Sequence, residues 1–222
     1  ARLLAEYGAD VLKITCEQHP DFAHFEGDTG FGKRRTVLDI ASPVGREQFA
    51  ALLRECDVFC QAYRPAAMRG LGYSPLQVAR IRPGIVYASL NAFGYTGELR
   101  ERRGFDTVIQ SASGIAYVSG RGREPKFYPA SALDYLAGDL LVFGILVALT
   151  RRAKEGGSYA VNVSLARTGD WLTAMGRFDD STVDAIAAEF TADELARWLI
   201  EVPSPLGRLT RLRPVIRFSD GI

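Results

Sequence analysis

The chain has 222 residues, of which 47% are hydrophobic, and its 27 Lys and Arg residues nearly balance its 26 Asp and Glu residues. This is enough for one domain with a full core, or for a large and a small domain. The balanced charge argues against a nucleic-acid-binding protein, which usually carries a net basic surface. The three cysteines lack the spacing of a disulfide framework or a zinc site and suit a reducing compartment. We therefore expect a soluble, cytoplasmic protein with no metal, nucleic-acid or membrane partner, since the sequence also shows no signal peptide.

The first ninety residues alternate between helix and strand patterns. Two Ser-Pro pairs, Ser42-Pro43 and Ser74-Pro75, indicate helix starts, with Ser as the N-cap and Pro at the first helical position. The predicted helices cover residues 1–7, 43–55, 66–69 and 75–81, and the predicted strands cover residues 10–14, 35–40, 57–62 and 84–90. Residues 16–32 read as a long surface loop. Strands that alternate with helices predict an α/β fold, a Rossmann-like parallel sheet with flanking helices.

The second half begins with a helix over residues 105–114 and an irregular stretch over 116–133. Residues 136–154 form the longest helical pattern, strongly apolar and followed by Gly156 and Gly157, which predicts a buried helix rather than a membrane span. A fifth strand is expected over residues 159–165, and polar helical and extended patterns follow Gly176. We therefore divide the chain into a large domain, residues 1–176, and a small or truncated C-terminal part, residues 177–222.

Several short segments occur in an order and spacing that resemble one known family. They are the segments at 8–14, 33–39, 62–65, 71–73, 82–89, 104–111 and 156–165, together with Asp134 and Gly138. The chain resembles class III CoA-transferases, the family of formyl-CoA transferase, carnitine CoA-transferase and alpha-methylacyl-CoA racemase. The resemblance implies that residues 1–176 form a CoA-binding domain, that residues 177–222 are a return segment, and that two chains interlock as a homodimer. It also implies an N-terminal strand and an insertion near Gly176 that are not seen, so we expect a partial chain.

Asp134 matches the catalytic aspartate of that family. A carboxylate can attack a thioester carbonyl to give a mixed anhydride and then an aspartyl-CoA thioester, from which an acceptor acid takes the CoA. The helix that follows is expected to stabilise the anionic carboxylate. From the residues alone, Asp134 could equally be a helix N-cap. The resemblance implies a CoA-transferase with an acyl-CoA donor, a carboxylic acid acceptor and coenzyme A as the group transferred.

By matching, a further set of residues would line the path of coenzyme A. Leu38, Ala41, Ala62, Tyr63 and Arg64 would flank the nucleotide, and Arg102, Arg103 and Phe105 would lie near the pantetheine. Arg64 could pair with a phosphate or form a surface ion pair. Cys16, Ala41, Ala62 and Gly70 stand where some members carry basic or amide residues. A non-catalytic member that binds CoA esters therefore stays an alternative.

A second alternative is a 2-methylacyl-CoA racemase. Racemisation needs two groups that exchange a proton with the α-carbon. The racemases carry His where this chain has Phe105, and the only histidines are His19 and His24. The resemblance thus favours transfer over racemisation.

Overall fold

The structure is a computed structural model that describes residues 1–18, 25–187 and 189–216. It contains two compact units: residues 39–176 form one, and residues 1–38 with 177–222 form the other. The first is called the sheet unit below and the second the terminal unit. The predicted large domain, residues 1–176, therefore spans the sheet unit and the first part of the terminal unit, and its assignment as one domain stays a prediction.

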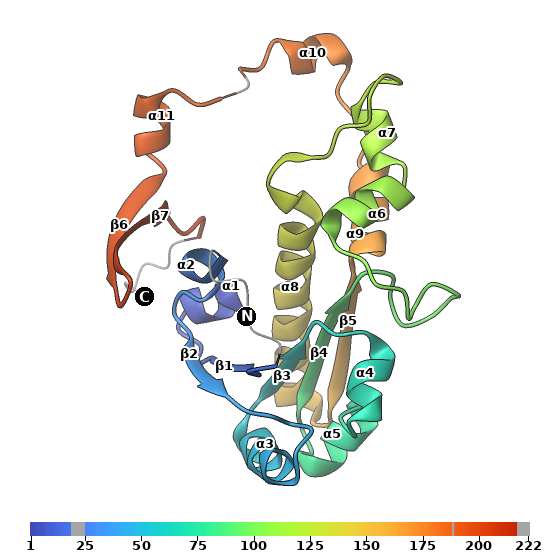
Figure 1. Cartoon of the computed structure of the whole chain (residues 1–222), viewed down its shortest axis with the longest axis vertical. Helices are drawn as coiled ribbons and strands as arrows, with labels where there is room; N and C mark the ends of the chain where they lie inside the picture. The colour runs from blue at the N-terminus through green and yellow to red at the C-terminus, as the bar shows by residue number, and fades with distance from the viewer. Residues whose placement is uncertain (19–24, 188, 217–222) are drawn as a thin grey trace. The chain divides into compact units, whose positions relative to one another are not determined.

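The sheet unit is built on three parallel strands, β3 (Val58–Gln61), β4 (Val86–Asn91) and β5 (Tyr159–Ser164), in the order β3-β4-β5 (Figure 1). In register, Val58 lies opposite Val86, and Val86 lies opposite Tyr159. The central strand β4 is buried at every position except Leu90, which is half-buried. A parallel strand with this apolar run needs cover on both faces of its sheet.

Helices supply that cover. One face carries Tyr87, whose ring meets Phe59 edge-on and whose hydroxyl donates to the carbonyl of Tyr73 at 3.1 Å. Phe49 belongs to the same aromatic group, and its ring centroid lies 4.7 Å from that of Tyr73. The helices beside these residues are α3 (Pro43–Glu55), α4 (Pro65–Gly70) and α5 (Pro75–Ile81). The Pro residues that begin α3 and α5 confirm the two predicted Ser-Pro starts.

The opposite face packs against α8 (Ala132–Glu155), which contacts β4 and β5. The helix approaches closely at Gly144, where a Cβ atom would lie 2.6 Å from Val161 Cγ1. At the C-terminal end, Arg152 pairs with Asp57 at 2.9 Å and donates to the carbonyl of Gly84 at 3.0 Å. The helical stretch Pro129–Glu155 is long and apolar enough to cross a membrane, and the core helices of soluble proteins can have the same length and composition.

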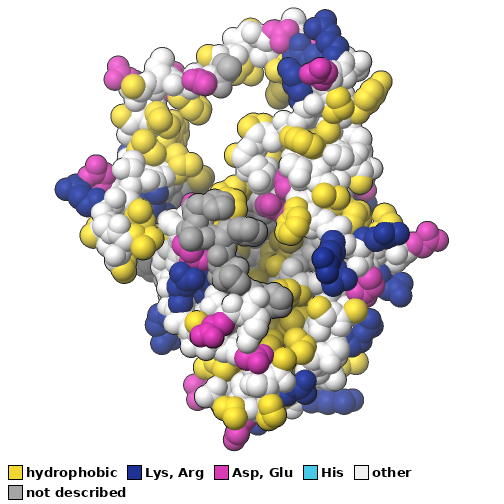
Figure 2. All heavy atoms as spheres, viewed as in Figure 1, with side chains coloured by type: hydrophobic (Ala, Val, Ile, Leu, Met, Phe, Trp, Pro, Cys, Tyr) yellow, Lys and Arg dark blue, Asp and Glu magenta, His cyan; other side chains and the backbone are white. Residues whose placement is uncertain are grey.

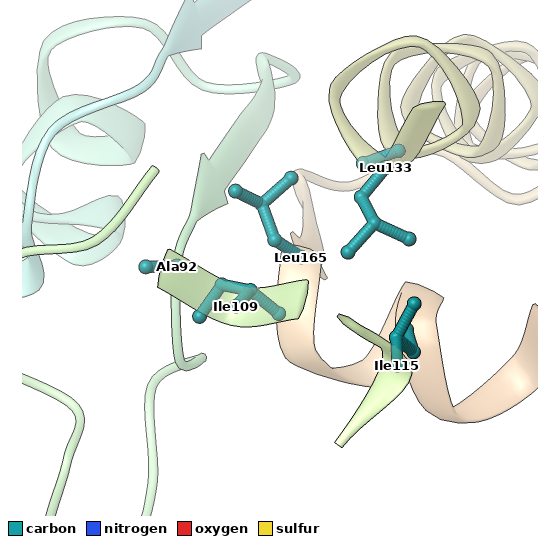
Figure 3. Packing of buried hydrophobic residues seen from close by; sticks show 6 residues of the cluster. Ala92, Ile109, Ile115, Leu133 and Leu165 are labelled. Carbon is teal, nitrogen blue, oxygen red and sulfur yellow. The ribbon is translucent and has the colours of Figure 1, made fainter. Parts of the chain in front are cut away.

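Four further elements complete the sheet unit near the start of α8. They are α6 (Asp106–Ala112), α7 (Ile115–Ser119), the 3₁₀ turn η2 (Pro129–Ser131) and α9 (Leu165–Ala174). Buried side chains from this region converge in one cluster (Figure 3): Ala92, Ile109, Ile115, Leu133, Ala137 and Leu165. This cluster anchors the first turn of α8 against α6 and α9.

The terminal unit holds a second parallel pair, β1 (Leu12–Thr15) with β2 (Arg34–Val37), and an antiparallel hairpin of β6 (Leu199–Ser204) and β7 (Gly207–Leu212). Short helices α1 (Arg2–Glu6), α2 (Glu26–Thr29), α10 (Asp180–Asp184) and α11 (Ala192–Ala196) accompany them. Arg211 of β7 pairs with Glu6 at 2.6 Å and lies over the ring of Phe31. Hydrophobic side chains gather on the surface over α11 and β6 (Figure 2).

The prediction of a mixed α/β fold with parallel strands and flanking helices is confirmed. The parallel strands of the described residues form one pair and one three-stranded sheet in place of the single sheet expected, and the Rossmann-like class stays a prediction. The helix expected over 105–114 ends earlier than predicted, at Ala112. Gly114, with φ of 79°, then separates α6 from α7. Helix α9 was not predicted, and α8 begins four residues before the expected start.

Candidate active site

Asp134 lies in the first turn of α8, three residues after the N-cap Ser131. The residue is exposed, while its neighbour Leu133 is fully buried in the cluster of Figure 3. The carboxylate of Asp134 accepts no hydrogen bond from a helix-start amide in the part of the chain that the structure describes. The interpretation of Asp134 as an N-cap is therefore wrong, and its carboxylate is left available for a substrate.

Another carboxylate caps this helix from a distance. Asp106, at the start of α6, accepts hydrogen bonds from the backbone N–H of Leu133 at 2.8 Å and of Asp134 at 3.3 Å. Asp106 is 3% exposed, and its second oxygen accepts from the side-chain amide of Gln110. These hydrogen bonds give Asp106 a structural role, the support of the start of α8.

The backbone that leads into α8 is unusual. Ala130 and Ser131 are both left-handed, with φ of 58° and 49°. A residue with a side chain adopts this conformation at a cost of about 1 kcal/mol. Two such residues in succession occur where the surrounding structure fixes them, and such strain often accompanies functional positions.

The environment of Asp134 changes its acidity. Desolvation by the surrounding protein raises the pKa of Asp134 to about 6, and the negative charge of Asp106 acts in the same direction. The expectation that the helix start stabilises the anion stays a prediction, and desolvation and the charge of Asp106 act against it. Asp106 already occupies the amides of Leu133 and Asp134, so these do not reach the Asp134 carboxylate. A carboxyl group with a pKa near neutrality in an accessible position is a candidate for chemistry.

A second feature of the sheet unit, which does not include Asp134, is the edge where the strands end. Gln61, the last residue of β3, donates to the Tyr95 hydroxyl at 3.0 Å and accepts from the backbone N–H of Tyr63 at 2.6 Å. Arg64 donates to the carbonyl of Glu101 at 3.2 Å. The turn after β3 is thereby fixed to the loop after β4, as expected for a ligand site at the carboxyl edge of a parallel sheet.

A cleft of about 870 Å³ opens at the ends of β4 and β5. Its wall is mixed, with aromatic and apolar side chains beside a few polar ones, as in many ligand sites. Polar and aromatic members of the wall include Tyr95, Asn162, Ser164, Arg167, Thr168 and Trp171. The sequence analysis assigned none of these residues to a site. Ser164 gave one possible signal, because it ends a strand and caps α9 by accepting from the backbone N–H of Arg167.

The structure brings some of the predicted coenzyme A residues together. Ala62, Tyr63 and Arg64 follow β3, and Arg102 and Arg103 lie on the loop joined to it, all of them exposed. Phe105, 74% exposed, precedes α6. Leu38 belongs to the terminal unit and Ala41 to the sheet unit, and His19 and His24 lie outside the described residues. Contact of these residues with coenzyme A stays a prediction.

The sheet unit thus holds an exposed carboxylate of raised pKa at the start of α8 and a cleft at the ends of its strands. Comparison with known proteins identifies the family. The profile of the CoA-transferase family III matches residues 1–186. An acetyl-coenzyme A transferase, nodX, of Hypoxylon pulicicidum is 32% identical, covering 82% of this chain and 32% of its own length. The chain belongs to the CoA-transferase family III, which confirms the resemblance drawn from the sequence.

Other relatives span two activities. The beta subunit of a succinyl-CoA–L-malate CoA-transferase of Chloroflexus aurantiacus is 31% identical over 74% of this chain and 44% of its own length. Human alpha-methylacyl-CoA racemase is 28% identical over 78% of this chain and 45% of its own length. A CAIB/BAIF family protein from Brucella suis superposes with a TM-score of 0.70 at 25% identity, covering 80% of this chain and 54% of that one. The chain thus spans less than half the length of these curated relatives.

Proposed function

We propose that this chain belongs to an acyl-CoA:carboxylate CoA-transferase in which Asp134 is the nucleophile. The observation that carries the proposal is the exposed, uncapped carboxylate of Asp134 at the start of α8, with a pKa of about 6. At neutral pH most of this group is ionised, yet it is more basic than an ordinary aspartate. Both properties suit nucleophilic attack on a thioester.

The steps follow from the chemistry of a carboxylate and a thioester. An oxygen of Asp134 attacks the thioester carbonyl and the carbon–sulfur bond breaks. The CoA thiolate is the leaving group, and a mixed anhydride forms between the acyl group and Asp134. The thiolate then attacks the Asp134 carbonyl, which releases the donor acid and forms an aspartyl-CoA thioester. The acceptor carboxylate attacks this thioester to give a second anhydride, and the thiolate attacks its acyl carbonyl. The products are a new acyl-CoA and free Asp134.

Racemisation is the weaker candidate, although a racemase is among the relatives. It requires a second group that exchanges protons with the α-carbon. Phe105, at the position that the resemblance assigns to the racemase His, neither donates nor accepts a proton. Transfer needs one carboxylate only, and Asp134 supplies it.

The test is Asp134→Asn in the intact protein. Acetyl-CoA and succinyl-CoA serve as donors, and oxalate, malate and glutarate, which appear in the names of relatives, serve as acceptors. We expect the wild type to form an Asp134 hydroxamate when quenched with hydroxylamine, identified by peptide mass spectrometry. Asp134→Asn should lose the hydroxamate and at least about 1000-fold in kcat, because no nucleophile remains.

Two results would contradict the proposal. One is wild-type turnover by Asp134→Asn with an unchanged circular dichroism spectrum. The other is rapid exchange of the α-proton of (R)-2-methylacyl-CoA for deuterium, with inversion and without an acceptor acid. The second result would assign the racemase activity instead.

A further inference from the structure

The segment from Tyr128 to Asp134 is attached to α6 at both ends. At one end, the backbone N–H of Tyr128 donates to Gln110 Oε1 at 2.7 Å. At the other, the backbone N–H groups of Leu133 and Asp134 donate to Asp106 Oδ2 at 2.8 and 3.3 Å. Helix α6 therefore fixes the backbone on which Asp134 is carried.

The two attachment points are themselves linked. Gln110 Nε2 donates to Asp106 Oδ1, one turn earlier on the same helix. Asp106 is 3% exposed and Gln110 is 0% exposed, so water does not compete for these bonds. A buried polar network whose members are all satisfied is rigid and specifies one geometry.

The backbone between the attachment points needs such support. Ala130 and Ser131 hold left-handed conformations that neither residue favours. Ser131, the N-cap of α8, makes no side-chain capping bond within the described chain. The hydrogen bonds from α6 take the place of local capping at the turn before Asp134.

From these contacts we infer that Asp106 and Gln110 are positioning residues: their buried relay holds the turn at Ala130 and Ser131 so that the Asp134 carboxylate meets the thioester carbonyl. The inference rests on the proposed function and deepens it. Asp106 and Gln110 act through the backbone of α8 and do not touch the substrate. Displacement of a reacting group by about 1 Å can lower a rate by about 100-fold.

The donors and acceptors of the relay allow a sharp test. In Asp106→Asn, the introduced amide N–H₂ faces the N–H₂ group of Gln110, so two donors meet. If the Gln110 amide rotates by 180° to avoid this, its own N–H₂ group faces the backbone N–H of Tyr128, and two donors meet there instead. Gln110→Glu places two carboxylates in hydrogen-bonding contact. The double variant Asp106→Asn/Gln110→Glu restores every pairing. In it, the amide introduced at position 106 donates to the carboxylate introduced at position 110, and that carboxylate still accepts from Tyr128. Only the position of the charge changes.

The experiment measures hydroxylamine trapping of Asp134 and steady-state transfer from acetyl-CoA in the intact protein. We expect each single variant to lose about 100-fold in kcat while KM for acetyl-CoA stays within about threefold, and the double variant to recover to within about tenfold of wild type. Thermal unfolding followed by circular dichroism shows the folded fraction of each variant. Glu155→Gln, at the far end of α8, is the control and should match wild type.

A double variant that is folded yet no faster than the slower single variant would overturn the inference, as would Asp106→Asn with wild-type kcat. If both single variants fail to fold, Gln110→Met decides, because it removes the acceptor for Tyr128 and the donor to Asp106 Oδ1 without adding a charge; a wild-type trapping rate would then refute the positioning role. Absence of trapping in the wild type would instead contradict the proposed function.

Discussion

The reactivity of Asp134 and its contribution to the stability of the fold depend on pH in opposite directions. Its carboxyl group must be ionised to attack, and desolvation and the charge of Asp106 raise its pKa from 3.8 to about 6. Its folded-state pKa is above the unfolded value, so the native state binds this proton more tightly. The contribution of Asp134 to stability is therefore present below about pH 4 and lost as pH rises through 6, whereas reactivity increases over the same range.

We expect the rate of the acetate burst from acetyl-CoA, measured without an acceptor acid, to increase with pH, with a midpoint near 6 and a plateau above about pH 7. Rapid-quench measurement of labelled acetate released from acetyl-CoA follows the burst. Asp106→Asn should move the midpoint to lower pH, because the negative charge that opposes ionisation is removed. A rate that is flat from pH 5 to 8 would contradict this assignment of the ionising group.

Asp134 itself could be found from the sequence, but its surroundings could not. The resemblance selects one aspartate before an apolar helix. The cap from Asp106 joins residues 27 positions apart and depends on how α6 packs on α8. No local pattern signals it, because an N-cap is normally sought beside the helix it caps.

At the scale of elements, the packing of α8 on β5 is closest to a backbone contact at one glycine, Gly144. A Cβ atom at Gly144 would lie 2.6 Å from Val161 Cγ1, whereas at Gly138 it would have no described atom within 4 Å. Both residues lie in the same helix, so the two alanine variants separate packing from helix propensity.

We expect Gly144→Ala to lower the free energy of unfolding by about 1–3 kcal/mol, because α8 must move away from the sheet. Gly138→Ala should leave it unchanged or raise it by up to about 1 kcal/mol, the gain in helix propensity. Urea denaturation followed by circular dichroism measures both. Equal effects of the two substitutions would show that the close approach at Gly144 is unimportant.

Elements with a local start signal were predicted well. Ser42-Pro43 and Ser74-Pro75 mark the starts of α3 and α5 as observed. Helix α9 was missed because it follows β5 without a loop, and Ser164 serves both as the last strand residue and as the N-cap. The early start of α8 was missed because left-handed Ala130 and Ser131 carry no glycine that would mark a turn.

At the scale of the whole molecule, α8 presents an apolar surface. Phe143, Leu146 and Val147 are 68%, 51% and 43% exposed and lie three and four residues apart, on one side of the helix. Large exposed apolar side chains in a group mark surfaces that are covered in an assembly. The resemblance to interlocked dimers suggests a second copy of the chain as the cover.

We therefore expect a homodimer at micromolar concentration, measured by size-exclusion chromatography with light scattering on the intact protein. Phe143→Glu should weaken the dimer, since a charge in an apolar interface is costly to bury. The matched substitution Thr150→Glu, at an exposed position near the end of the same helix, should leave it intact. A wild type that is monomeric throughout would contradict the expectation.

The division into two units is the feature that the sequence was least able to predict. Five parallel strands were expected in one sheet, and they occur as a pair and a group of three. Strand pairing is set by packing between distant segments, and periodicity along the chain identifies strands without fixing their neighbours.

The pairing of β4 with β5 has a consequence for synthesis on the ribosome. In that pair Ser89 lies opposite Asn162, so a strand made early waits for one made much later. Contacts so distant in sequence form slowly, because a long loop must close first. Until β5 emerges, β4 has an open edge and the inner side of α8 lacks part of its sheet. The nascent chain exposes apolar surface during this interval, and α8 completes its packing only after β5 has been made.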